Sequence, residues 1–272
     1  MYQFTVYLNW YYYIQNAEQL KTRGYYRDLK DLIETMYREN DNTKVTIVTH
    51  SLGGPVSLYF LTSISDITQE WKDKYINSFI PLSGAWSGGN EILYTEINGR
   101  DFFEDVDFIS TGMLTKPILR SFQSMVWLLP HASVWNNTVI VTTPSRSYTA
   151  NDYEALFRDI GFPEGYTMYQ GILDINKGWP APNVPTHCFY GVGVPTELEF
   201  IYDRGFPDAE PVRIINGDGD GDVNIESSLV CHHWANSQYP FEYTEFSGVG
   251  HRQILKNEAV LRAIENIVAV TN

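Results

Sequence analysis

The amino-acid sequence predicts an α/β fold with a mostly parallel sheet, and three features of the chain favour that class. Helix-like and strand-like segments alternate between residues 29 and 82, as they do where helices cover a parallel sheet. A β-branched apolar run at residues 44–48 leads into the turn Ser-Leu-Gly-Gly at residues 51–54. An amphipathic helix follows the last strand-like segment, which completes the pattern.

The first part of the expected core extends over residues 1–90. Apolar and polar side chains alternate along residues 2–10, which predicts a half-buried strand. A helix is expected next, because its apolar residues share one face: Leu29, Leu32, Ile33, Met36 and Tyr37. Residues 44–48 and 76–82 read as buried strands, and Pro55 stands in the first turn of the helix between them.

Residues 91–180 break this alternation and predict a cap inserted over the carboxyl edge of the sheet. Aromatic-rich helical fragments and loops dominate this part of the chain. Strand-like segments then return at residues 187–192, 212–215 and 241–246. Asn257 is the expected cap of the final helix, so the second part of the core is assigned to residues 181–272.

Composition and charge narrow the classes of function. The chain has 272 residues, of which 43% are hydrophobic, enough for a large buried core. It has 19 Lys and Arg and 33 Asp and Glu, which gives a formal net charge of −14. Its Lys and Arg residues form no cluster in the sequence, which argues against nucleic acid as a partner. No uninterrupted apolar run is long enough to span a bilayer. Residues 1–17 lack the basic leader and apolar block of a signal peptide.

The segment Thr49-His-Ser-Leu-Gly53 resembles a nucleophile elbow. In such a turn a serine stands between a strand and a helix, so that its hydroxyl projects from the sheet. Ser51 is therefore the candidate nucleophile, and the backbone N–H of Leu52 is a candidate oxyanion donor. Thr49 departs from the glycine of the usual G-x-S-x-G pattern, and an ordinary strand-to-helix junction is the alternative interpretation.

A serine nucleophile needs a base, and His251 is the best placed of the six histidines. It follows the strand-like segment 241–246 through a glycine-containing loop and precedes the last helix, where an α/β-hydrolase carries its histidine. His50 is expected to point elsewhere. The remaining histidines lack this loop context: His131, His187, His232 and His233.

The acid that orients the base is expected in the loop Gly217-Asp-Gly-Asp-Gly-Asp-Val223, which offers Asp218, Asp220 and Asp222. A calcium loop is the competing interpretation, but its pattern requires glycine at position 223 and glutamate at position 229, and neither is present. A glycine-rich turn with solvated carboxylates is the structural alternative. The chain order Ser, Asp, His is that of α/β-hydrolases.

Several segments together resemble the lecithin:cholesterol acyltransferase family, and most closely its lysosomal phospholipase A (group XV) branch. The resemblance covers residues 23–270 and rests on these segments: Thr49-His-Ser-Leu-Gly53, Trp71-Lys-Asp-Lys-Tyr-Ile76, Trp127-Leu-Leu-Pro130, Asp159-Ile-Gly-Phe162, Cys188-Phe-Tyr-Gly-Val-Gly-Val-Pro195, Gly205-Phe-Pro207 and Gly217-Asp-Gly-Asp-Gly-Asp-Val-Asn224. The resemblance implies an α/β-hydrolase fold.

The resemblance also assigns individual residues. In the family the acid lies two residues before a Thr-Val pair, which selects Asp220 here, with Asp222 in place of the threonine. The positions of Cys188 and Cys231 match a family disulfide, whereas two unpaired buried thiols are the alternative. The sequon at Asn136 stands where the phospholipase branch carries a sugar.

The implied function is acyl transfer from glycerophospholipids by Ser51, His251 and Asp220 to water or a lipid alcohol, with no metal or cofactor. The implied partners are a phospholipid membrane or lipoprotein surface and the acceptor alcohol, and the implied location is lysosomal or secreted. Apolar cap residues are expected either to form the cap's own core or to line an acyl-chain track: Trp127, Leu128, Leu129 and Trp135.

Two departures from the family shape these expectations. Only 50 residues precede Ser51, so we expect amino-terminal strands of the family fold to be lacking. No residue is assigned as the second oxyanion donor. Gly84-Ala-Trp-Ser-Gly-Gly89 replaces the family's Gly-Ala-Pro-Trp-Gly-Gly. A soluble carboxylesterase on the same fold and a catalytically impaired lipid-binding relative are the alternatives.

Overall fold

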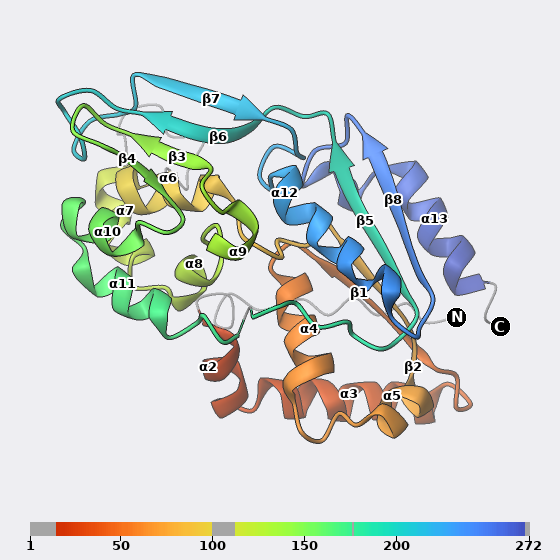
Figure 1. Ribbon diagram of the computed structural model, residues 1–272. Coiled ribbons are helices and arrows are strands. Elements are labelled where there is room, and N and C mark those ends of the chain that lie inside the picture. Colours follow the sequence, from red (N-terminus) through yellow and green to blue (C-terminus); the bar gives the residue numbers. More distant parts are fainter. Residues whose placement is uncertain (1–14, 100–111, 176, 270–272) are drawn as a thin grey trace.

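Two four-stranded sheets organise the part of the chain that the computed structural model describes, residues 15–99, 112–175 and 177–269 (Figure 1). Sheet A has the order β1 (Val45–His50), β2 (Ile76–Leu82), β5 (Thr186–Val192) and β8 (Phe241–Ser247), with every neighbouring pair parallel. These four strands confirm the parallel sheet predicted from the sequence. The strand expected over residues 2–10 lies outside the described residues.

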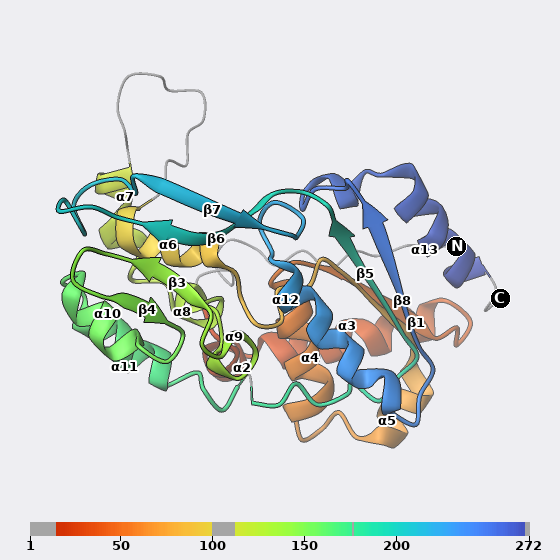
Figure 2. The same cartoon turned by 45° about the horizontal axis from the view of Figure 1, so that its top comes forward.

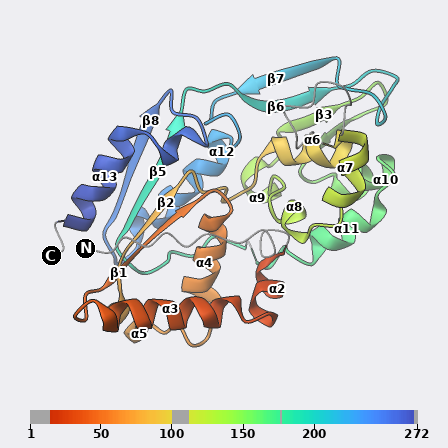
Figure 3. The same cartoon turned by 180° about the vertical axis from the view of Figure 1, so that it is seen from behind.

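Helices cover both faces of sheet A. One face carries α3 (Tyr25–Glu39), α4 (Gly53–Ser63) and α5 (Gln69–Tyr75), preceded by the short α2 (Ala17–Thr22), and the other face carries α13 (Glu258–Ala269), as Figure 3 shows from behind. Successive strand residues point to opposite faces. Phe79 therefore joins the core on the α4 side, whereas Ile80 joins a second cluster with Val260 and Ile264 of α13.

Sheet B has the order β4 (Ser147–Thr149), β3 (Val139–Thr142), β6 (Thr196–Ile201) and β7 (Arg213–Gly217). Only its central pair, β3 and β6, is parallel. Helices of the predicted cap lie along one side of this sheet (Figure 2): α6 (Asn90–Asn98), α7 (Gly112–Leu119), α8 (Gln123–Trp127), α9 (Ala132–Trp135), α10 (Tyr153–Asp159) and α11 (Pro163–Gln170). Sheet B thus combines strands from both sides of residue 180, and the division of the chain into domains at that residue stays a prediction.

The connection between the two sheets brings the acid loop to the carboxyl edge of sheet A. The chain leaves β5, runs through β6 and β7, and returns to the front of sheet A through α12 (Ile225–Ser228) and the 3₁₀ helix η1 (Leu229–Asn236) (Figure 1). Cys231 lies within η1. A second short 3₁₀ helix, η2 (Gln253–Leu255), precedes α13.

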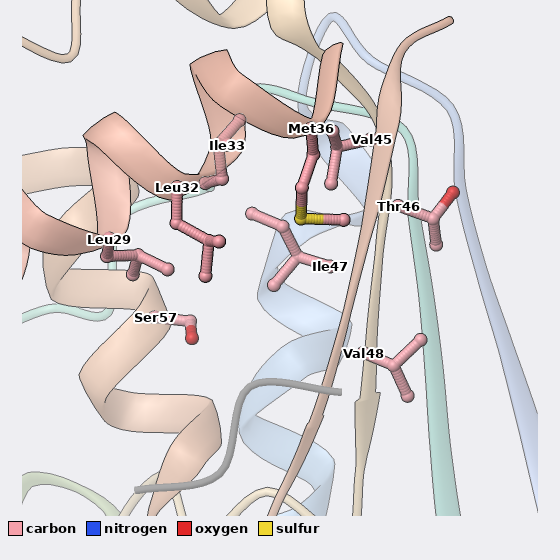
Figure 4. Close-up of a pocket in the computed structure, with 9 residues that line it drawn as sticks. All are labelled: Leu29, Leu32, Ile33, Met36, Val45, Thr46, Ile47, Val48 and Ser57. Carbon is pink, nitrogen blue, oxygen red and sulfur yellow. The ribbon is translucent and has the colours of Figure 1, made fainter. Parts of the chain in front are cut away.

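A small apolar groove opens beside the outer strand of sheet A, between α3 and β1 (Figure 4). Leu32 and Met36 of α3 face Ile47 of β1 across it. The groove is lined neither by the serine turn nor by the loops that carry Asp220 and His251.

None of the helices in the described part of the chain is long and apolar enough to cross a membrane.

Candidate active site

Ser51 occupies a strained turn between β1 and α4. Its φ of 54° lies in the left-handed region that residues with a Cβ rarely adopt. The turn is fixed by its backbone, because the Ser51 N–H donates to the Leu82 carbonyl at 3.1 Å and the Ser51 carbonyl accepts from Gly54 at 2.9 Å. The hydroxyl makes no hydrogen bond to a described residue, and the side chain is partly exposed. This is the backbone geometry that presents a nucleophile.

Small residues explain why the chain can turn so sharply here. A Cβ on Gly53 would lie 3.4 Å from the Cβ of Thr49, an ordinary van der Waals contact, so the threonine that departs from the usual motif fits beside this turn. A Cβ on Gly54 would approach the Trp86 ring at 3.0 Å and the Cα of Gly84 at 3.1 Å. Leu52 stands at the start of α4, where backbone N–H groups have no acceptor within the helix.

Asp220 and His251 form a buried hydrogen-bonded pair. The Nδ1 atom of His251 lies 2.8 Å from Oδ2 of Asp220, and the two residues are 8% and 1% exposed. The backbone N–H of His251 also donates to the Asp220 carbonyl at 2.7 Å. Because an ionised carboxylate only accepts, Nδ1 carries the hydrogen. The neutral imidazole then has its free lone pair on Nε2.

The three aspartates of the acid loop have different partners. The second carboxylate oxygen of Asp220 accepts from the backbone N–H of Val223 at 2.8 Å and of Asp222 at 3.2 Å. Asp218 instead accepts from the N–H groups of Gly193 at 2.6 Å and Gly219 at 2.7 Å, which closes the loop onto the end of β5. Of these three side chains, only that of Asp220 is bonded to a histidine.

The surroundings of Asp220 favour its charged form. Burial acts to raise the pKa of this carboxyl, but the hydrogen bond and positive charge of His251, together with the Val223 N–H, outweigh it. The pKa of Asp220 therefore lies below its usual value. A carboxylate that stays charged can hold the imidazole and stabilise its protonated form.

His50 was expected to point away from the site, and that expectation is wrong. Its Nε2 atom lies 2.9 Å from the backbone carbonyl oxygen of His251, and the centres of the two rings are 4.5 Å apart. The sequence placed His50 next to Ser51 but gave no sign that the His251 loop would cover it. This contact brings the loop that follows β8 to the end of β1, so Ser51 and His251 lie at the same edge of sheet A.

Ser83 is a second residue that the sequence did not reveal. It follows β2, is fully buried and has a φ of 47°. Its hydroxyl has no hydrogen bond of standard geometry to a described residue, although it helps to lower the pKa of Asp220. No motif marked this position in advance.

The loop after β2 connects the serine turn to the acid loop. The N–H of Ser87 donates to the Ser227 hydroxyl at 2.9 Å, and the N–H of Asn90 donates to the Asn224 side chain at 3.2 Å. Trp86 is buried against Gly54 and Gly84, with its ring edge-on to that of Trp234. The residues that depart from the family pattern thus pack behind the serine turn.

The predicted disulfide between Cys188 and Cys231 is present. It joins β5 to η1 across 43 residues of sequence. Because η1 follows the acid loop, the bond ties the carboxyl-terminal end of that segment to sheet A.

The remaining sequence-predicted residues fall outside this cluster. Asn136 is exposed at the end of α9. Four apolar cap residues are buried in the core, with exposures of 4% or less: Trp127, Leu128, Leu129 and Trp135. His187 of β5 pairs with Glu242 at 3.2 Å, and His232 of η1 contacts the Tyr190 hydroxyl at 2.8 Å.

Comparison with known proteins gives concordant results. The family model described as "Lecithin:cholesterol acyltransferase" matches residues 8–257. Lysosomal phospholipase A and acyltransferase of Mus musculus is 36% identical over 246 residues, covering 90% of this chain and 58% of the relative. Phosphatidylcholine-sterol acyltransferase of Gallus gallus is 35% identical over 243 residues, covering 87% of this chain and 56% of the relative. The chain thus spans somewhat more than half the length of these relatives.

A solved structure supports the fold. A chain in the crystal structure of the Tle4-Tli4 complex superimposes with a TM-score of 0.58 and 14% sequence identity, covering 96% of this chain and 68% of the other. At that identity the likeness concerns the fold alone. Together with the parallel sheet and the serine turn, it identifies the architecture as an α/β-hydrolase fold.

Proposed function

Because the chain belongs to the lecithin:cholesterol acyltransferase family, we propose that Ser51, Asp220 and His251 act as a catalytic triad on acyl esters of glycerophospholipids. The observation that carries this proposal is the buried bond between His251 and Asp220 at the edge of the sheet where Ser51 turns. It fixes the imidazole with its free nitrogen lone pair on Nε2, the atom that must accept the serine proton.

The chemistry follows from that tautomer. His251 Nε2 takes the proton of the Ser51 hydroxyl while Oγ attacks the ester carbonyl and forms a tetrahedral intermediate. When the intermediate collapses, the bond to the glycerol oxygen breaks, and His251 returns the proton to the departing lysophospholipid. The acyl group is left on Ser51. Water or a lipid alcohol then gives its proton to His251, attacks the acyl-serine and releases the free acid or a new ester.

The negative charge of the tetrahedral intermediate needs donors. The Leu52 N–H, at the start of α4, is the proposed first donor of the oxyanion hole. Loss of a single donor typically lowers the rate by about a hundred- to a thousandfold. The second donor of the oxyanion hole is not assigned, and the chain covers 56% and 58% of the two relatives. That this chain is active is therefore part of the proposal.

The same reasoning extends to location and partners. One relative carries the word lysosomal in its name. A disulfide is typical of proteins of oxidising compartments, and the exposed Asn136 is open to glycosylation. We therefore propose a lysosomal or secreted glycoprotein that acts at a phospholipid membrane or lipoprotein surface and uses a lipid alcohol or water as acceptor.

The test is labelling of the purified chain with a fluorophosphonate probe, which bonds only to an activated serine. We expect labelling of the wild type, no labelling of Ser51→Ala, and a large loss with His251→Ala. Turnover of phosphatidylcholine vesicles should fall by about 10⁴-fold or more in both variants. His187→Gln, which alters a histidine remote from Ser51, is the matched control and should label normally.

Other outcomes identify the alternatives. Labelling with turnover of short monomeric esters but no preference for vesicles would identify a soluble carboxylesterase. A folded wild-type chain that takes no label would contradict the triad and favour a catalytically impaired lipid-binding relative.

A further inference from the structure

The His50 imidazole occupies a position that the proposed triad does not explain. It is the last residue of β1, directly before Ser51, and its ring lies against the ring of His251 with 4.5 Å between their centres. Its Nε2 atom is 2.9 Å from the backbone carbonyl oxygen of His251. His50 therefore links the end of the strand that leads to the nucleophile with the loop that carries the base.

The chemistry of the contact fixes the tautomer of His50. A carbonyl oxygen only accepts, so the hydrogen of the contact must lie on His50 Nε2. This contact reaches the backbone of His251. The His251 side chain is held separately, by the bond from Nδ1 to Asp220. The two bonds thus divide the work: Asp220 orients the ring, and His50 anchors the backbone of the residue that carries it.

The surroundings of His50 keep it uncharged over most of the acidic range. Burial lowers the pKa of His50 to about 4, and the positive charge of a protonated His251 acts in the same direction. The carbonyl of His251 and the carboxylates of Asp220 and Asp222 act the other way but do not outweigh burial. Because the charged form is disfavoured, His50 is neutral above about pH 4.

We propose that His50 is a positioning residue that anchors the His251 loop to the end of the nucleophile strand. The inference rests on the proposed function, since the value of an anchored base depends on a serine to deprotonate. A small displacement of a base from its working distance is enough to lower a rate about a hundredfold. A second cation beside His251 would disfavour the imidazolium that forms when Ser51 attacks.

Two substitutions of His50 distinguish the effect of its hydrogen bond to the His251 carbonyl from the effect of its side-chain volume. Glutamine at position 50 supplies an uncharged N–H donor at a similar reach, whereas leucine fills similar volume without a donor. We expect His50→Leu to lower kcat for a soluble p-nitrophenyl ester by at least tenfold with little change in KM, and His50→Gln to restore kcat to within about threefold of the wild type. Thermal unfolding of both variants establishes that they are folded, and His187→Gln is the matched control.

Proton NMR tests the position of the base without relying on turnover. The His251 Nδ1–H that faces Asp220 should give a downfield resonance in the wild type and in His50→Gln. In His50→Leu this resonance should shift or broaden. The Cε1–H signal of His50 should titrate with a midpoint near pH 4, and Ser51→Ala should leave both signals in place.

The possible failures are distinguishable. If the wild type takes no fluorophosphonate label, the proposed function fails, but the NMR spectra of Ser51→Ala still report on the anchor. The anchoring role is wrong if folded His50→Leu keeps wild-type kcat and an unchanged Nδ1–H resonance, or if His50→Gln is as impaired as His50→Leu.

Discussion

Asp218, Asp220 and Asp222 stand at alternate positions of one loop, yet their environments differ. Asp220 is 1% exposed and bonded to His251, whereas Asp218 accepts backbone N–H groups that close the loop. Asp222 contributes its own N–H to the Asp220 carboxylate. An Asp222 substitution that leaves the backbone in place should preserve this bond.

This difference gives a prediction at the scale of single residues. Asp220→Asn should lower kcat/KM for a soluble ester by about 10³- to 10⁴-fold, because an amide no longer enforces the Nδ1–H tautomer of His251. Asp222→Asn keeps the backbone donor and should cost less than about tenfold. Steady-state kinetics of the two variants check this, and equal losses in both would contradict the assignment of Asp220 as the acid.

The sequence predicts these residues unevenly, and the reason is physical. Ser51 was predictable because its turn depends on adjacent residues, and His251 because its loop has a fixed place in the chain order. The role of Asp220 came from the family resemblance, since the loop itself leaves three aspartates open. The contact of His50 depends on which loop from 201 residues away covers the end of β1, and no local pattern encodes that.

Among the elements, α6 carries an unusual buried acid. Glu96 is 0% exposed, and neither of its carboxylate oxygens has a hydrogen-bond partner among the described residues. Arg120 lies 4.0 Å from Oε2 but directs its own hydrogen bonds to the Glu96 backbone carbonyl, at 2.9 and 2.6 Å. Burial therefore raises the pKa of Glu96 to about 7, against the opposing effect of Arg120.

The raised pKa predicts a pH-dependent stability. Between the unfolded value of 4.5 and the folded value of about 7, the folded state binds more protons than the unfolded chain, so stability falls as pH rises through this range. The full penalty above the folded pKa is about 3 kcal/mol. Relative to wild type, Glu96→Gln should therefore gain stability between pH 5 and pH 8.

Denaturant unfolding at several pH values measures this difference. Glu164→Gln, at an exposed position on α11, is the matched control and should run parallel to the wild type. If the stability difference between wild type and Glu96→Gln were the same at pH 5 and pH 8, Glu96 would not titrate as proposed.

Sheet B shows where element prediction was incomplete: β7 was expected at residues 212–215, whereas β3, β4 and β6 were not expected. The segment of β6, Thr-Glu-Leu-Glu-Phe-Ile, places Glu197 and Glu199 in a strand, and glutamate is depleted in strands. The structure accommodates Glu199 because the Thr142 hydroxyl of β3 donates to it at 2.7 Å. The central strands of sheet A, β2 and β5, were easier to predict, since they are buried along most of their length and such strands are largely apolar.

For the whole molecule, net charge predicts how the chain meets a lipid surface. The formal charge of −14 should repel anionic vesicles at neutral pH and low salt. Binding of Ser51→Ala to vesicles containing phosphatidylglycerol should therefore be weaker than to pure phosphatidylcholine, and should increase with added salt and with acidification toward pH 5. Cosedimentation measures both trends.

Pure phosphatidylcholine vesicles serve as the control, because binding to them should change little with salt. Tighter binding to the anionic vesicles at neutral pH, weakened by salt, would show instead that a local basic surface outweighs the net charge.

The distance in sequence between His50 and His251, 201 residues, has a consequence for biosynthesis. Closing so long a loop is entropically costly, and contacts of this kind form late in folding. If Ser51 and His251 act together as proposed, a nascent chain on the ribosome carries its serine long before the histidine that activates it has been made. A polypeptide whose synthesis stops before residue 251 would be chemically inert toward the membranes around it, so that the ability to cut lipid would arise only once translation has passed that point.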